Sequence, residues 1–234
     1  MGIHTSRIIP ILVMFWVLVG SILPAGTWNA RFERTVKSAH FTESEEQQIH
    51  NLLTEAQEDQ IPVDLLVLRL EEGVAKRVPT STLYNALELE RQAYSYTRDL
   101  IVHELGLQEA ERIVSDNTIW SRVTTIYRQG VPDEDLKALI AMFNKQRSAE
   151  RWNNFRYGGG LLIALRQWGL EETLSLKVVE ALSRSSIPGE DYRAVIDLFN
   201  AGISNRTSLE DIANRIIDSA PNSRSLKVLE RMVR

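Results

Sequence analysis

Histidine is the side chain most often used for metal binding and proton transfer, and this sequence has four: His4, His40, His50 and His103. His40 and His50 are ten residues apart, whereas a helix binds zinc through two histidines at positions i and i+4. His103 precedes Glu104, but the second histidine of a zinc-protease motif is absent. The chain also lacks cysteine, which excludes disulfides, thiolate metal sites and a cysteine nucleophile. We therefore expect no metal and no cofactor.

Carboxylates in pairs are the next candidates, because two of them can cleave a glycosidic bond when one is a general acid with a raised pKa. The sequence offers three such pairs: Glu71–Glu72, Glu88–Glu90 and Glu171–Glu172. The first pair adjoins Gly73 in an apolar stretch, so we expect one of its members to be partly buried. No substrate-positioning motif and no G-x-S-x-G elbow accompanies any pair. We predict no catalytic residue, and keep a helical, peptidoglycan-directed hydrolase as the alternative function.

Tyrosine and arginine gather in the stretch YNALELERQAYSYTRD, residues 84–99, and again beside the glycines of residues 151–170. Such residues can bind a sugar or a peptide by stacking and by hydrogen bonding. Tyrosine at helical spacing also lies commonly at the edge of a core, with its hydroxyl in water. The candidate binding surface comprises Tyr84, Arg91, Tyr94, Arg98, Arg156 and Tyr157.

Three consecutive glycines, Gly158, Gly159 and Gly160, interrupt the stretch RWNNFRYGGGLLIALRQWGL. One interpretation is an anion nest of backbone N–H groups with Arg156 beside it. However, no Lys-Ser/Thr follows, and the dinucleotide-binding pattern is absent. We favour a structural role instead: either a close crossing with another helix, or a break between an aromatic helix and the apolar helix that follows.

The elements that must position these residues are helices, since no alternating strand pattern and no Asn-Gly or Asp-Gly turn is found. One pattern recurs: an aliphatic residue, then proline, then apolar residues four and eight positions later. It occurs at Pro62, Pro79, Pro132 and Pro188. Proline is tolerated in the first turn of a helix, and apolar residues four apart share one face. The residues at these positions are Leu66, Leu83, Leu136 and Tyr192, and then Leu70, Leu87, Ile140 and Ile196.

The fold predicted from these signals is all-α, an array of antiparallel helical hairpins. Between Pro79 and Pro132 the pattern recurs after 53 residues, and between Pro132 and Pro188 after 56. These similar spacings indicate degenerate helical repeats. The expected helices are about 43–60, 63–77, 80–105, 107–129, 133–147, 150–168, 170–185, 189–202, 207–219 and 222–233. The expected caps are Thr42 with Glu45, Thr80, an internal break at Asp116, and Ser208 or Thr207, with Gly106 and Gly169 closing helices.

Residues 8–25, IIPILVMFWVLVGSILPA, carry no charge and follow Arg7. A basic start before a long apolar run is typical of a secretory signal, and this run is also long enough to span a bilayer. Two alternatives stay open: cleavage near Ser21 or Ala25, or a retained anchor with Trp28 at the outer membrane surface. The predicted organisation is therefore a signal peptide or signal anchor over residues 1–30, and a single helical domain over residues 31–234.

The charge balance, 27 basic against 31 acidic residues, argues against nucleic acid as a partner. Together with the leader, the helical pattern favours an exported or membrane-anchored helical-repeat protein that acts as a non-enzymatic interaction or scaffold module. We expect it in the periplasm or cell envelope, either free or anchored in the inner membrane through residues 8–25. The expected partner is an envelope protein.

Overall fold

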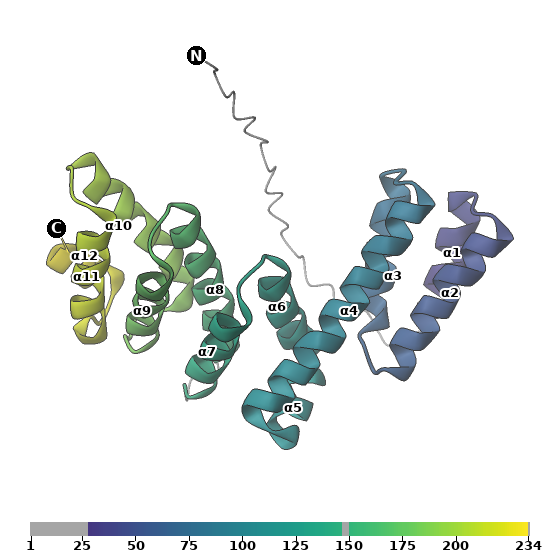
Figure 1. Ribbon diagram of the computed structural model, residues 1–234, viewed down its shortest axis with the longest axis horizontal. Helices are drawn as coiled ribbons and strands as arrows, with labels where there is room; N and C mark the ends of the chain where they lie inside the picture. The colour runs from purple at the N-terminus through teal and green to yellow at the C-terminus, as the bar shows by residue number, and fades with distance from the viewer. Residues whose placement is uncertain (1–27, 147–149, 234) are drawn as a thin grey trace, which may run out of the picture.

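The computed structural model describes residues 28–146 and 150–233, and in these ranges the protein is all-α, as the sequence predicts (Figure 1). No strand occurs in the part of the chain so described. The α-helices are α1 (Trp28–Ala39), α2 (Glu43–Glu58), α3 (Val63–Ala75), α4 (Thr80–Leu105), α5 (Leu107–Val114), α6 (Asn117–Arg128), α7 (Asp133–Asn144), α8 (Arg151–Gln167), α9 (Glu172–Ser183), α10 (Tyr192–Ser204), α11 (Leu209–Ser219) and α12 (Leu226–Val233). Short 3₁₀ turns lie at Gly189–Asp191 and Ala220–Asn222.

The helices lie side by side in a bent array, with α1 and α2 at one end and α11 and α12 at the other (Figure 1). The long helix α4, together with α5 and α6, lies in the middle of the bend (Figure 1). Each helix packs mainly on its near neighbours in sequence: α1 on α3, α4 on α6, α7 on α8, and α9 on α11. The buried apolar side chains nevertheless form one continuous cluster from Phe32 to Val233.

The proline pattern marks helix starts, as predicted. Pro62, Pro79 and Pro132 immediately precede α3, α4 and α7, and Pro188 precedes the 3₁₀ turn that leads into α10. All of the predicted inward residues are buried except Ile196, which is partly exposed. The exception follows from the 3₁₀ turn, because its tighter winding rotates later residues relative to an α-helix that began at the proline.

Helix ends follow the predicted signals with one exception. Thr42 and Glu45 form the expected capping box: the Thr42 Oγ1 accepts from the Glu45 N–H at 3.3 Å, and the Glu45 carboxylate accepts from the Thr42 N–H at 2.8 Å. Asp116 separates α5 from α6 and caps α6. Ser208 caps α11. Thr80 was predicted as a cap, but it is already the first residue of α4, because Pro79 takes the preceding position.

Two glycines close helices in the way that their spacing predicts. Gly106 ends α4 with φ of 78°, and Gly169 follows the end of α8 with φ of 88°. Residues other than glycine rarely adopt this left-handed conformation, so these two positions let the chain reverse direction within one or two residues.

Helix α1 was not predicted, and its first three residues fall within the range 1–30 that the sequence assigned to the leader. The Trp28 indole packs on Phe32 and His50, and its Nε1 donates to Gln57 Oε1 at 2.8 Å. Arg31 binds Glu71 of α3 at 2.6 Å. Trp28 therefore belongs to the helical array. The apolar run 8–25 lies outside the described residues. Within the described ranges, no helix combines the length and apolarity needed to cross a membrane.

Candidate functional site

The three glycines lie inside the continuous helix α8, so the predicted close crossing is present and the predicted break is not. A Cβ on Gly158 would lie 2.7 Å from Phe143 Cζ, and a Cβ on Gly159 would lie 2.7 Å from Ile126 Cδ1. Gly160 has no neighbour within 4 Å of its Cβ position. Because backbone N–H groups in a helix interior bond to carbonyls of the preceding turn, these glycines form no anion nest.

Of the candidate tyrosines on α4, Tyr94 is a core residue: it is 2% exposed and packs edge-on against Trp120, with ring centroids 5.3 Å apart. Burial raises the pKa of its hydroxyl to about 12. Tyr84 is half-buried and packs against the same core. The hypothesis that these two rings offer a stacking surface is therefore wrong for Tyr94, which faces inward because its position coincides with the buried stripe of α4.

Arg91 and Arg98 bind the end of α2. Arg91 donates to Glu88 at 2.9 Å and to Asp59 at 3.1 Å. Arg98 donates to the Asp59 backbone carbonyl at 3.1 Å and to Gln60 Oε1 at 3.2 Å. Orphan carbonyls at a helix C-terminus attract such donors. These two arginines therefore connect α2 to α4. Of the six candidate residues, only Tyr94 is buried.

A partly exposed aromatic pair lies between α4 and α6. Tyr96 stacks on Tyr127 of α6 with centroids 4.8 Å apart, and its hydroxyl donates to the Asp133 carboxylate. That hydrogen bond raises the pKa of Tyr96 to about 12. The sequence places Tyr96 in the same tyrosine-rich stretch, but no local pattern connects it to Tyr127 or Asp133, which lie more than 30 residues away.

The paired carboxylates form ion pairs or cap helices. Glu90 is 8% exposed and lies between Arg69 and Arg128, each 3.0 Å away. The hydrogen bond from Arg91 lowers the pKa of Glu88, and the backbone N–H of Thr173 lowers the pKa of Glu171, which caps α9. A general acid needs a shift in the opposite direction. Of the remaining members, Glu71 pairs with Arg31 and Glu72 with Arg69.

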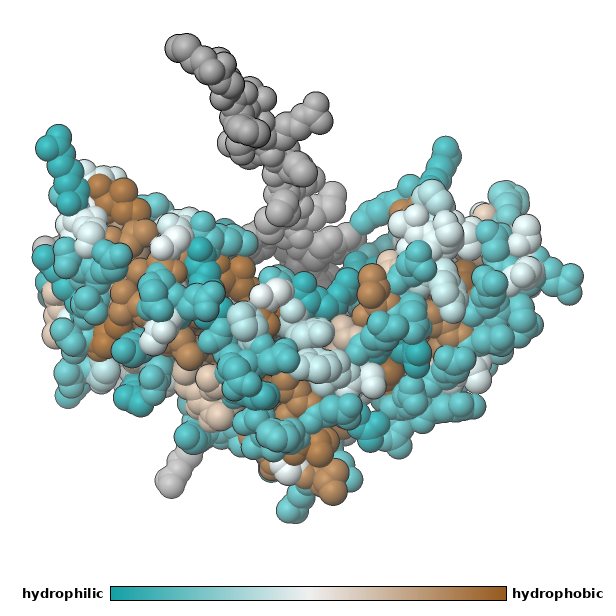
Figure 2. Space-filling view, in the orientation of Figure 1, coloured by the Kyte–Doolittle hydropathy of each residue, from teal (hydrophilic) through white to brown (hydrophobic). Residues whose placement is uncertain are grey.

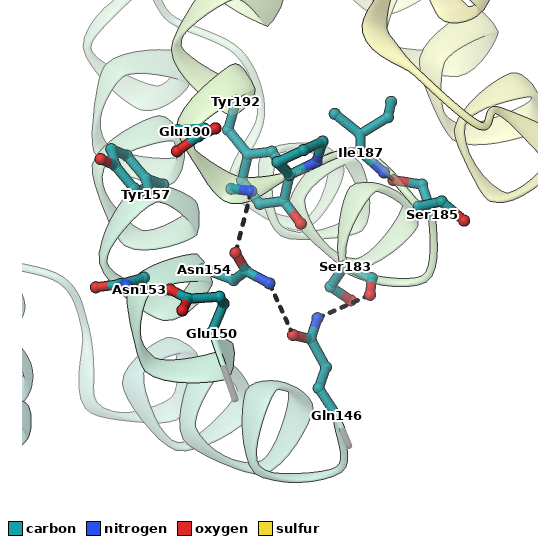
Figure 3. A pocket seen from close by; sticks show the side chains of 13 residues that line it. Gln146, Glu150, Asn153, Asn154, Tyr157, Ser183, Ser185, Ile187, Glu190 and Tyr192 are labelled. Carbon is teal, nitrogen blue, oxygen red and sulfur yellow. Dashed lines mark hydrogen bonds between the residues drawn. The ribbon is translucent and has the colours of Figure 1, made fainter. Parts of the chain in front are cut away.

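A cavity with a volume of about 600 Å³ lies between α8, the end of α7 and the turn that precedes α10 (Figure 3). Asn154 is its central side chain. Its Oδ1 accepts from the Gly189 N–H at 3.0 Å, and its Nδ2 donates to Gln146 Oε1 at 3.2 Å. Gln146 in turn donates to the Ser183 carbonyl at 2.8 Å. This chain of amides fixes three segments around one opening.

Both polar and apolar groups form the rest of the cavity wall. Tyr157 of α8 and Glu190 of the 3₁₀ turn lie along the same side of the opening (Figure 3). Tyr192 is fully buried and donates to the Leu182 carbonyl at 3.1 Å, so it supports the wall rather than the opening. No three His, Asp or Glu side chains converge on a metal-sized space among the residues that the structure describes. The wall suits recognition by hydrogen bonds.

Tyr157 and Arg156 are the candidate residues that the structure does place together on an accessible surface. The Arg156 guanidinium lies 5.5 Å from the centroid of the Tyr157 ring. Both extend from the first half of α8, where Trp152 and Phe155 anchor the opposite face in the core.

Over the described residues, the fold is that of an all-α protein with an extended surface and a cavity beside α8. No protein family, no curated protein and no solved structure matches the chain.

Proposed function

We propose that the protein is a non-enzymatic interaction module, an exported or membrane-anchored helical-repeat protein that binds a partner protein in the cell envelope. One observation carries the proposal: of the paired carboxylates, Glu71, Glu72, Glu88 and Glu90 are held in ion pairs, and Glu171 caps α9. The cavity beside α8 is lined by amide and hydroxyl side chains together with Glu150 and Glu190, and such groups can recognise a ligand by hydrogen bonding.

The surface of the array supports this role. Stacked helices give an extended surface, because each helix buries only the faces that touch its neighbours. Figure 2 shows apolar residues over the end of the array formed by α9 to α12 and over the α4–α5 corner, with hydrophilic residues between them. Several large apolar side chains are accessible to a partner, with Leu107 at 69% exposed, Leu89 at 63% and Ile203 at 48%. Partner-binding surfaces commonly combine such residues with a polar rim.

The location in the envelope is proposed from the sequence of residues 1–30, in which Arg7 precedes the uncharged run 8–25. Export of the helical array follows for both forms of this leader. A cleaved signal would release the array, and a retained anchor would keep it at the outer surface of the inner membrane.

The test is photo-crosslinking in living cells with the full-length chain. A photoreactive amino acid replaces Tyr157 at the cavity, and a matched variant carries it at Asn51, on the exposed face of α2 at the far end of the array. We expect one dominant envelope protein to be captured at position 157 and little at position 51. Capture of cytoplasmic proteins alone would contradict export. An unpartnered chain that releases fragments from purified peptidoglycan would replace the proposal by the hydrolase.

A further inference from the structure

The two helices α6 and α8 approach each other closely where Ile126 lies against Gly159. They run in the same direction, because α7 reverses the chain between them: Asp135 near the start of α7 pairs with Arg166 near the end of α8. Parallel helices in this register bring Arg122, four residues before Ile126, and Arg156, three residues before Gly159, to the same level. We call this place the α6–α8 seam.

Among the described residues, neither guanidinium of the seam has a direct ion pair. The Arg156 guanidinium lies over the Tyr157 ring, 5.5 Å from its centroid. Partial burial and the charge of Arg156 both lower the pKa of Arg122. The groups that face Arg122 are Arg156, Asp116, Glu150 and Tyr157. Of these, Asp116 is already engaged in capping α6 through the N–H groups of Thr118 and Ile119.

The neighbouring arginine shows that the lack of an ion pair is particular to the seam. Arg151, on α8 one turn or so before Arg156, closes onto Glu109 of α5 at 2.9 Å. Most other partly buried arginines are neutralised in the same way, such as Arg31 by Glu71 and Arg166 by Asp135. Arg122 is partly buried and Arg156 is exposed, so their like charges repel, and an anion shared between them would offset this repulsion.

We propose that the α6–α8 seam binds an anionic oxygen group, a carboxylate or a phosphate, between the guanidinium groups of Arg122 and Arg156. Each guanidinium presents several N–H donors in a planar fork, which matches the paired oxygens of such a group. The Arg156 guanidinium lies over the Tyr157 ring, and Tyr157 also lines the cavity beside α8. An acidic group bound at the seam would therefore lie beside a ligand in that cavity. This inference rests on the proposed interaction role and names the chemistry of the partner.

The test uses the purified full-length chain in mild detergent, with two probes: inorganic phosphate and a tetraglutamate peptide. Binding is followed by the side-chain N–H resonances of arginine and by calorimetry. We expect saturable binding of one probe or both, and a loss of about tenfold or more in affinity for Arg122→Gln and for Arg156→Gln, since each removes a charge-assisted contact. Arg231→Gln, an exposed charge on α12, is the control and should change affinity less than twofold.

The two probes separate the sources of the anion. Binding of phosphate alone indicates a phosphoryl group, and tighter binding of the peptide indicates an acidic protein segment. Arg122→Lys keeps the charge but loses the fork, so it should bind with intermediate affinity. No saturation with either probe below about 50 mM, or an equal loss in Arg231→Gln, would overturn the inference. Binding in vitro without an envelope partner in cells would instead contradict only the proposed function.

Discussion

Single glycines in α8 decide how close its neighbours can come. Gly158 lies against the fully buried Phe143 and against Val179, whereas Gly160 has open space at its Cβ position. The cost of a glycine in a helix, about 1 kcal/mol relative to alanine, is the same at both positions. Of these two glycines, only Gly158 lies at a close helix crossing, whose packing offsets this cost.

We therefore expect opposite effects from two alanine substitutions. Gly158→Ala should lower the free energy of unfolding by about 1–2 kcal/mol, because overpacking of a core outweighs the gain in helix propensity. Gly160→Ala should raise it by up to about 1 kcal/mol. Denaturant unfolding of the two variants beside the parent protein measures both. Stabilisation by both substitutions would show that α8 can move away from Phe143 at little cost.

At the residue scale, the sequence indicates which side chains are unusual better than it indicates which other residues they contact. It identifies Tyr94 and Arg91 as unusual, but a tyrosine in a stripe faces the core or the solvent according to about one residue of register. Arg122 carries no local signal at all, since its significance comes from Arg156 on another helix. Pairs that form across the array depend on packing, and packing is not encoded in any short stretch.

At the scale of the helix, the ends were predictable because capping is local. A hydroxyl or carboxylate needs only the next three residues to find its N–H partner, as Thr42, Asp116 and Ser208 do. Helix α1 was missed for a different reason: its first three residues were assigned to the leader, and residues 31–39 were assigned to no helix. The repeat predicted from the proline pattern stays a prediction, although the prolines themselves mark helix starts.

Helix caps should make stability sensitive to acid. The N–H of Thr173 lowers the pKa of Glu171 at the start of α9, and the N–H of Thr42 lowers that of Glu45 at the start of α2. A lowered pKa in the folded protein means that the stabilisation is complete above the unfolded value of about 4.3 and is lost as pH falls through the folded value. The free energy of unfolding should therefore decrease as pH falls below about 4.5.

The variant Glu171→Gln tests this expectation, since an amide oxygen still accepts from the Thr173 N–H but does not titrate. Its unfolding free energy should decline less steeply than that of the parent protein between about pH 5 and pH 2.5. Glu230→Gln, in the middle of α12 where it caps no helix, serves as the control. If both variants follow the parent curve, the capping carboxylate contributes nothing to the acid sensitivity.

At the scale of the whole molecule, the helices pack mainly on near neighbours, so stability should be distributed along the array rather than shared by one unit. Leu229 is fully buried where α12 packs on α10 and α11. Leu229→Ala should destabilise this end by about 2–4 kcal/mol. Hydrogen exchange should then accelerate in α10–α12 and stay unchanged in α2–α4, because each interface acts on its neighbours first. Equal acceleration at both ends would show that the continuous core unfolds as a single cooperative unit, and a partner bound at the bend would then stabilise every helix alike.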